Sequence, residues 1–512
     1  MEKRTEISQK SLIVFVAVSL FYYLWVTAQI PYCHDDWDWG LPVGIQQLLT
    51  ANLNSRYVGN FIEVVLTRSL FLKTACMGTV FALIPLYAVR AISFAAFPKL
   101  TEESAVSALV LGHILMVTVP PQIWEQTFGW VAGFSNFVVS AFFLVLYQIL
   151  VIKLLRDKES NIFQVILVTF FGIAIQLLLE NVAVYVVLCS TAVLLFTLVK
   201  RHRVSKSVIG LWGGNLVGTV IMFSSSVYKT LAENGTAIDG YRTLSFDRGE
   251  GLIRIAVSFV RRFMILYPDF IWIRNTVLCC ALLVLMTLLQ MVKQRNIVKR
   301  FAWTTINLLF FVYTISHRFA GDIQLPSQWW TNVLRAGIAS LYFVVVLIQG
   351  FLLLHEDQRH RNLFLFFWLS APAVLLPMTV VSSVGWRSYL TSDLFLLETC
   401  LLLFMKLIVE EKNRSFRKAA AALFAAALCV IWGYFGVVYH DIGIVRIQRL
   451  ELITQAREGE TNSILLKAFP HGEYLWGPDP EYGSERVKYF RQFYQIPENV
   501  DLWFQNWADD RD

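Results

Sequence analysis

Thirteen apolar stretches divide this chain, and each has about the length that a membrane-spanning helix requires. A helix needs roughly 20 mostly apolar residues to cross a bilayer. Composition agrees, because 56% of the residues are hydrophobic and 16% are charged, whereas soluble domains average about 45–50% and about 25%. The sequence therefore predicts an all-α polytopic membrane protein and excludes a soluble multidomain enzyme. The predicted spans are residues 11–30, 73–95, 104–120, 133–152, 162–179, 182–199, 207–226, 271–292, 301–319, 336–354, 363–383, 391–409 and 419–439.

Lysine and arginine are concentrated in every second loop, from Lys3 and Arg4 to Lys418, and these loops hold 21 of them. The short turns near 121–132, 180 and 385–390 hold only Arg387. Because basic loops are retained in the cytoplasm, we expect a cytoplasmic N-terminus, an uncleaved first span and an extracytoplasmic C-terminus. Topology thus accounts for the net charge of +7, and a nucleic-acid partner is not favoured.

The segments expected on the outer face are the longest ones outside the membrane. The first loop runs from 31 to 73, and apolar residues at helical spacing over 55–70 predict an amphipathic helix lying on the membrane. The second loop, 227–270, has a similar stretch at 253–267, and a third loop covers 320–332. Residues 440–512 predict a small α+β cap. We therefore divide the chain into a membrane domain, 1–439, and an extracytoplasmic tail, 440–512.

Acidic residues stand at two points of the predicted outer face. Asp35, Asp36 and Asp38 follow the first span within four positions. Crowding and partial burial raise carboxylate pKa values, which suits a general base or a cation site; a solvated acidic loop end is the alternative. Two predicted spans fill the stretch between Asn161 and Lys200, and Glu180 is the only charged residue in it. An ionisable group at this position in the membrane is a candidate functional residue. Its alternative role is a turn residue that reaches the headgroups.

Aromatic, amide and basic side chains follow in later outer turns. Glu125, Trp130 and Asn136 flank one turn, a combination typical of sugar contacts, although Gly129 and Gly133 also suit close helix packing. Arg387 is the only charge in its turn, and arginine binds phosphate oxygens in bidentate fashion. Further phosphate candidates are Arg261, Arg262 and Arg318, for which interfacial snorkelling is the alternative.

These short motifs, in this order, resemble the GT-C class of integral membrane glycosyltransferases, and within it the bacterial Gtr-type glucosyltransferases. The motifs are the Asp35-Asp36 pair after the first span, residues 54–60, residues 129–136, Glu180-Asn181 and residues 385–389. The resemblance implies an inverting transfer from a polyprenyl-phosphate-linked sugar to a cell-envelope glycan, on the outer face of the plasma membrane. It implies Asp35, Asp36 and Glu180 as catalytic residues. It also places Asp38, Arg56, Asn60, Asn181 and Tyr389 among the substrate contacts.

Two other functions stay open at the level of the sequence. A flippase or transporter of polyprenyl-linked glycans would need charges along a path across the membrane, whereas the candidate charges gather on one face. A polymerase or ligase of such glycans is chemically close to the transferase, and only the size of the donor separates them. No motif demands a cofactor, and a divalent cation at the acidic loop stays open, as does the choice between Asp35 and Asp36 as the base.

Overall fold

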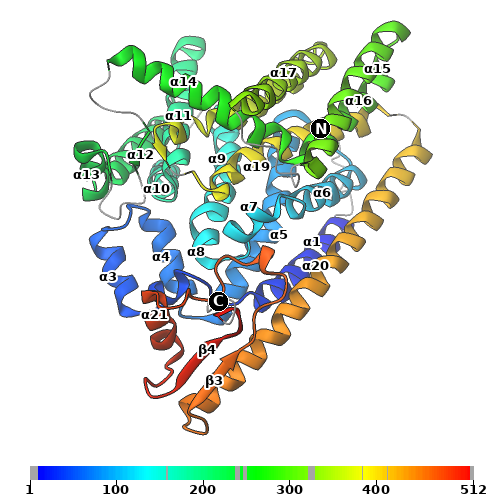
Figure 1. Cartoon of the computed structure of the whole chain (residues 1–512). Helices are drawn as coiled ribbons and strands as arrows, with labels where there is room; N and C mark the ends of the chain where they lie inside the picture. Colours follow the sequence, from blue (N-terminus) through cyan, green and yellow to red (C-terminus); the bar gives the residue numbers. More distant parts are fainter. Residues whose placement is uncertain are drawn as a thin grey trace.

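The structure is a computed structural model that describes residues 10–156, 160–236, 243–245, 251–320, 329–382, 384–411 and 413–507. Lys3, Arg4 and most of the third predicted outer loop, residues 321–328, lie outside the described residues. Helices dominate the described part, and they follow the apolar stretches because a backbone in lipid must satisfy its own hydrogen bonds. Figure 1 shows the helices gathered into one bundle, with α20 along its edge.

The bundle is built from helices that alternate with short turns. Its elements are α1 (Lys10–Gln29), α5 (Leu70–Ala96), α6 (Glu102–Val117), α7 (Pro121–Thr127), α8 (Val131–Gly133), the π-helix η1 (Phe134–Val138), α9 (Val139–Arg156), α10 (Ile162–Gln176), α11 (Glu180–Arg201), α12 (Lys206–Phe223), α15 (Thr276–Lys293), α16 (Ile297–Ala320), α17 (Trp329–Leu353), α18 (Gln358–Ala373), α19 (Leu390–Glu410) and α20 (Arg414–Arg457). Each predicted span overlaps one of these helices or a consecutive run of them, and the span 363–383 runs past the end of α18 at Ala373.

Among the described residues, nine helices are long and apolar enough to cross a membrane, and α6 with α7 make a tenth if the 90° bend between them belongs to one span. The polytopic all-α architecture is thus confirmed, whereas the number thirteen stays a prediction. The remaining predicted spans are α10, α16 and α19. Helix α10 has 15 residues, and α16 carries polar residues at both ends. Helix α19 is buried within the bundle and carries Asp393, Glu398 and Lys406.

Contacts between turns agree with the alternation predicted from the basic residues. Turns expected on the outer side meet one another, through the pairs His34–Gly477, Asp36–Ala132, Arg56–Glu180 and Arg387–Gln126. Turns expected on the basic side also meet, through the pairs Ser11–Glu102, Lys293–Glu356 and Lys406–Asp357. The tail therefore lies on the same side of the bundle as the first loop.

Short elements cover that side of the bundle. They are α2 (Asp36–Trp39), α3 (Pro42–Thr50), α4 (Tyr57–Leu66), α13 (Ser226–Asn234), β1 (Thr243–Leu244), α14 (Leu252–Pro268), the π-helix η2 (Asp269–Ile273), the 3-10 helices η3 (Leu376–Thr379) and η4 (Trp386–Tyr389), and β2 (Val381–Ser382), which pairs antiparallel with β1. Helix α4 differs from the surface helix expected over 55–70. It buries Asn60 and Glu63 against the protein while Phe61 is exposed, so its polar side takes part in the interior.

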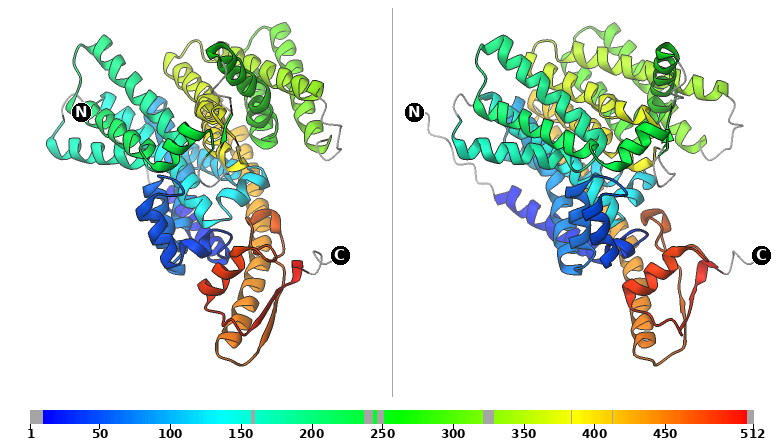
Figure 2. Two further views of the ribbon diagram at one scale, coloured as in Figure 1. Left: turned by 60° about the vertical axis from the view of Figure 1, so that its left-hand side comes forward. Right: turned by 90° about the vertical axis from the view of Figure 1, so that its left-hand side faces the viewer.

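The tail forms a cap at the far end of α20. Helix α20 is continuous for 44 residues and passes through the predicted domain boundary at 439–440 without a break. After it come β3 (Ser463–Leu466), the 3-10 helix η5 (Gly472–Tyr474), α21 (Glu485–Tyr494) and β4 (Asp501–Phe504), with β3 and β4 parallel. The core of the cap includes Trp37 from the first loop, which packs edge-on against Phe490 at 5.1 Å. The cap projects from the bundle (Figure 2), and its core is shared with that loop.

Candidate functional site

Asp36 fixes the first loop in place. Its side chain is fully buried, and its carboxylate accepts backbone hydrogen bonds from Cys33 at 2.9 Å and from Ala132 at 3.0 Å. Burial raises the pKa of Asp36 to about 8 although these two hydrogen bonds oppose the shift. The residue therefore joins the first loop to the turn before η1, and it does not face solvent.

Asp35 has a different environment from its neighbour. About 38% of its side chain is exposed, Oδ1 lies 2.5 Å from Nδ1 of His34, and Arg486 of the cap approaches to 3.6 Å. Burial favours the neutral acid, but the hydrogen bond and charge of His34 and the charges of Arg486 and Arg387 together hold the pKa of Asp35 below its ordinary value. Asp35 is thus an accessible carboxylate that is ionised at neutral pH.

Trp130 connects this loop to Arg387. Its ring meets the His34 ring edge-on at 5.6 Å, and the guanidinium of Arg387 lies 5.6 Å from the centre of the same ring. Arg387 comes from η4, and its backbone N–H donates to Gln126 at 3.4 Å. The acidic loop and the basic turn, far apart in the chain, therefore belong to one site.

A second arginine, Arg56, also lies near Phe137. Arg56 donates to Glu180 from Nε at 2.9 Å, and its Nη2 lies 2.8 Å from the same carboxylate oxygen. Tyr228 donates its hydroxyl to the other oxygen of Glu180. The guanidiniums of Arg56 and Arg387 lie 5.5 Å and 5.6 Å from the centre of the Phe137 ring, so both cations are close to this ring.

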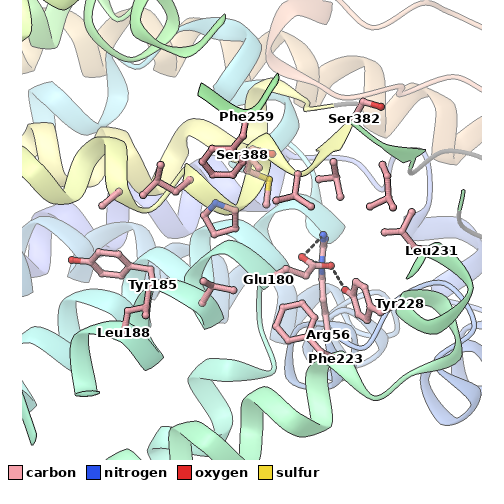
Figure 3. A pocket seen from close by; sticks show the side chains of 18 of the residues that line it. Arg56, Glu180, Tyr185, Leu188, Phe223, Tyr228, Leu231, Phe259, Ser382 and Ser388 are labelled. Carbon is pink, nitrogen blue, oxygen red and sulfur yellow. Dashed lines mark hydrogen bonds and ion pairs between the residues drawn. The ribbon is translucent and has the colours of Figure 1, made fainter. Parts of the chain in front are cut away.

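These two arginines stand in the wall of a cavity of about 740 Å³. Most of the wall is apolar, and it comes from α11, α12, α14 and the segment 373–388, with Leu188, Phe223 and Phe259 among its residues. Figure 3 shows Arg56, Glu180 and Tyr228 in contact at one end, with Tyr185 and Leu188 at the other. The cavity thus combines a charged end with an apolar body, which suits an amphiphile with an anionic group.

Buried amide and carboxyl groups line the junction between α4 and η1. The Nδ2 of Asn60 donates to Oδ1 of Asn54 at 2.9 Å, which orients the Asn60 side chain. The Nδ2 of Asn136 donates to the Ala132 carbonyl at 3.0 Å. Within the described part of the chain, Oδ1 of Asn60, Oδ1 of Asn136 and Oε1 of Glu63 are buried without a hydrogen-bond partner. Burial and the charges of the nearby aspartates raise the pKa of Glu63 well above its ordinary value.

The other predicted site residues lie elsewhere. Asn181 is buried and donates to the Val374 carbonyl at 3.2 Å, so it joins α11 to α18. Tyr389 stacks on Phe270 at 5.3 Å. Asp38 accepts from Gln47 at 3.4 Å, and burial together with the charge of Asp35 raises its pKa to about 7. The remaining four, Glu125, Arg261, Arg262 and Arg318, are outside the described lining of the cavity.

Several residues of the site were not predicted from the sequence. His34, Phe137, Tyr228 and Arg486 each contact a predicted site residue. One local signal existed for Phe137, because it stands beside Asn136 in the motif 129–136. Tyr228 and Arg486 carry no such signal, since only the fold brings them to Glu180 and Asp35.

No family model, no curated protein and no solved structure matches this chain. Within the described residues, no group of three or more His, Cys, Asp or Glu side chains is arranged to hold a metal ion.

Proposed function

We propose that the protein is an inverting glycosyltransferase that moves a sugar from a polyprenyl-phosphate donor to a glycan acceptor on the outer face of the plasma membrane. One observation carries the proposal. Two arginines, Arg56 and Arg387, line the charged end of an apolar cavity of about 740 Å³. The accessible carboxylate of Asp35 is connected to Arg387 outside that lining, through His34 and the Trp130 ring. The resemblance to GT-C enzymes adds the direction of transfer and the class of donor.

In this proposal the cavity holds the donor. The apolar wall contacts the first isoprene units, and the phosphate lies toward Arg387 and Arg56. The Arg56–Glu180 ion pair holds the Arg56 guanidinium at the charged end of the cavity. Fixed cations of this kind stabilise negative charge that develops on a leaving group.

The acceptor hydroxyl attacks the anomeric carbon, and its proton passes to Asp35. A bond forms between the acceptor oxygen and the anomeric carbon while the bond from that carbon to the phosphate oxygen breaks. The electron pair of the broken bond stays on the phosphate, next to the arginines, and a single displacement inverts the anomeric centre through an oxocarbenium-like state. Asp36 acts as a positioning residue, because both its oxygens are engaged with backbone N–H groups.

The orientation follows from the basic loops, with a cytoplasmic N-terminus and with the site and the cap outside. The flippase alternative receives less support. Glu398 of α19 accepts a hydrogen bond from Gln148 at 2.9 Å, and the buried acids of α19 are outside the described lining of the large cavity. A polymerase or ligase would use the same chemistry with a longer donor.

The test is direct. Purified protein in lipid nanodiscs is incubated with synthetic polyprenyl-phosphate sugars and a cell-envelope glycan acceptor, and product masses are measured. Addition of one sugar to the acceptor, with release of polyprenyl phosphate, is the expected result. Addition of a multi-sugar block would indicate a polymerase or ligase. Movement of the donor across a vesicle bilayer without a new glycosidic bond would replace the proposal with the flippase.

A further inference from the structure

A second hollow lies on the cap, away from the large cavity. Its volume is about 830 Å³, and its lining includes Tyr482, Lys488, Gln492, Gln495 and Trp507. We call it the cap groove. Helix α21 separates the groove from the first loop: Lys488, Gln492 and Gln495 lie on one side by helical spacing, and Arg486, Phe490 and Phe493 lie on the other. One face of α21 therefore contacts the loop of Asp35, and the opposite face forms the groove.

The walls of the cap groove are held in place by contacts within the cap. Trp507 donates from its indole N–H to the Pro480 carbonyl at 2.8 Å. Tyr482 meets the Trp507 ring edge-on at 5.2 Å and is itself 60% exposed. Arg491 donates to the Pro497 carbonyl at 3.0 Å, which holds the segment after α21 against the helix. The groove is thus preformed, with an exposed aromatic ring at its edge.

The chemistry of this lining suits a carbohydrate. Aromatic rings pack against the C–H faces of pyranose rings, while amide and ammonium groups hydrogen-bond to hydroxyls. The groove offers the exposed ring of Tyr482, which meets the buried Trp507 edge-on, for the first role, and Gln492, Gln495 and Lys488 for the second. We infer that the cap groove binds an oligosaccharide segment of the acceptor polymer; this inference rests on the proposed function.

The place of the groove on α21 links it to the reaction. Gly483 and Ser484, directly before α21, line the groove. Arg486, two residues further along, lies 3.6 Å from Asp35. A polymer that leaves the groove at this end of α21 therefore arrives at the loop that carries the base. Binding there raises the local concentration of acceptor hydroxyls without changing the chemical step.

Binding is measured first, without donor. The full chain in nanodiscs is applied to an array of bacterial surface oligosaccharides, and the best-bound one is titrated by calorimetry. Tyr482→Ala should weaken its affinity about tenfold, and Tyr482→Phe, which keeps the ring, should restore it. Leu465→Ala is the matched control, because Leu465 is 59% exposed on β3 of the same cap and is not part of the described groove. Absence of oligosaccharide binding, or equal loss in Leu465→Ala, overturns the inference.

Transfer is measured second, with acceptors of one repeat and of many repeats. Tyr482→Ala should raise KM for the long acceptor about tenfold and leave kcat, and KM for the short acceptor, unchanged. An equal rise for both acceptors overturns the inference. Oligosaccharide binding by a wild-type protein that transfers no sugar would support the groove and reject the proposed function. Transfer by a protein that binds no oligosaccharide would reject the groove alone.

Discussion

Arg56 and Glu180 form an ion pair of 2.8 Å across the junction of α4 and α11. Both side chains are largely buried, at 15% and 13% exposure. Removal of one member of a buried pair leaves an uncompensated charge and costs about 3–5 kcal/mol, whereas removal of both costs less. Arg56→Ala and Glu180→Ala should therefore each lower Tm more than the double variant does. Thermal unfolding in detergent measures this, and additive losses would contradict a coupled pair.

The base is tested by two isosteric substitutions. Asp35→Asn should abolish transfer while donor affinity stays close to that of the wild type, because proton acceptance contributes only in the transition state. Asp36→Asn should act mainly on stability, because an amide cannot accept both backbone hydrogen bonds. Transfer rate, donor affinity and Tm are measured for both. Full activity in Asp35→Asn with loss in a folded Asp36→Asn would assign the base to Asp36.

The role of Arg387 is tested by comparing its substitution by alanine with its substitution by lysine. Arg387→Ala should reduce kcat on the order of 10²-fold, by analogy with the loss of one donor to a developing anion. Arg387→Lys should recover only part of this loss, because an ammonium lacks the planar fork of a guanidinium. Arg318→Ala serves as the control, since Arg318 is exposed at the end of α16. Wild-type kinetics in a folded Arg387→Ala protein would remove the residue from the site.

The acid limb of the pH–rate profile reports on Asp35. Its pKa in the folded protein lies below the ordinary value, so the carboxylate is charged above that value and loses its charge only as the pH falls through the lowered pKa. Arg486→Gln removes one of the charges that lower it. The acid limb should therefore move to higher pH in this variant, with kcat on the plateau unchanged. An unshifted limb would show that the cap does not act on Asp35.

Topology is tested with a membrane-impermeant thiol reagent. Glu481 is exposed on the cap, next to the buried Pro480. Glu481→Cys should be labelled in intact cells, whereas a cysteine in place of Arg359, in a predicted cytoplasmic loop, should be labelled only after permeabilisation. The reverse pattern would invert the orientation and place the site in the cytoplasm.

Local features of the fold could be predicted from the sequence. The apolar run at 73–95 becomes Leu70–Ala96, and the one at 182–199 lies within Glu180–Arg201, because helices in lipid follow continuous apolar segments. Turns that the alternation of basic loops assigned to one side also contact one another in the structure. The polar α19 shows the limit of this reasoning, since Glu398 is buried there and accepts a hydrogen bond from Gln148 of α9, a contact that hydropathy does not describe.

The site could be predicted only in part. Glu180 and Arg387 stand alone in their turns, so charge alone singled them out. The partners Tyr228 and Arg486 depend on contacts between distant segments, and no local pattern encodes such contacts. Adjacent residues also diverge: Asp35 is accessible and Asp36 fully buried, a difference created by the turn from Cys33 into α2 and by the N–H of Ala132.

The shared core of Trp37 and Phe490 has a consequence for biosynthesis. The loop of Asp35 leaves the ribosome long before residues 477–493, which supply the Gly477 carbonyl to His34 and the Arg486 charge to Asp35. During that interval the loop lacks part of its packing and one of its charges. A chain truncated before α21 should therefore insert its spans normally and still carry an incompletely ordered first loop. In the full chain, the first loop can become fully ordered only after the cap has been translated.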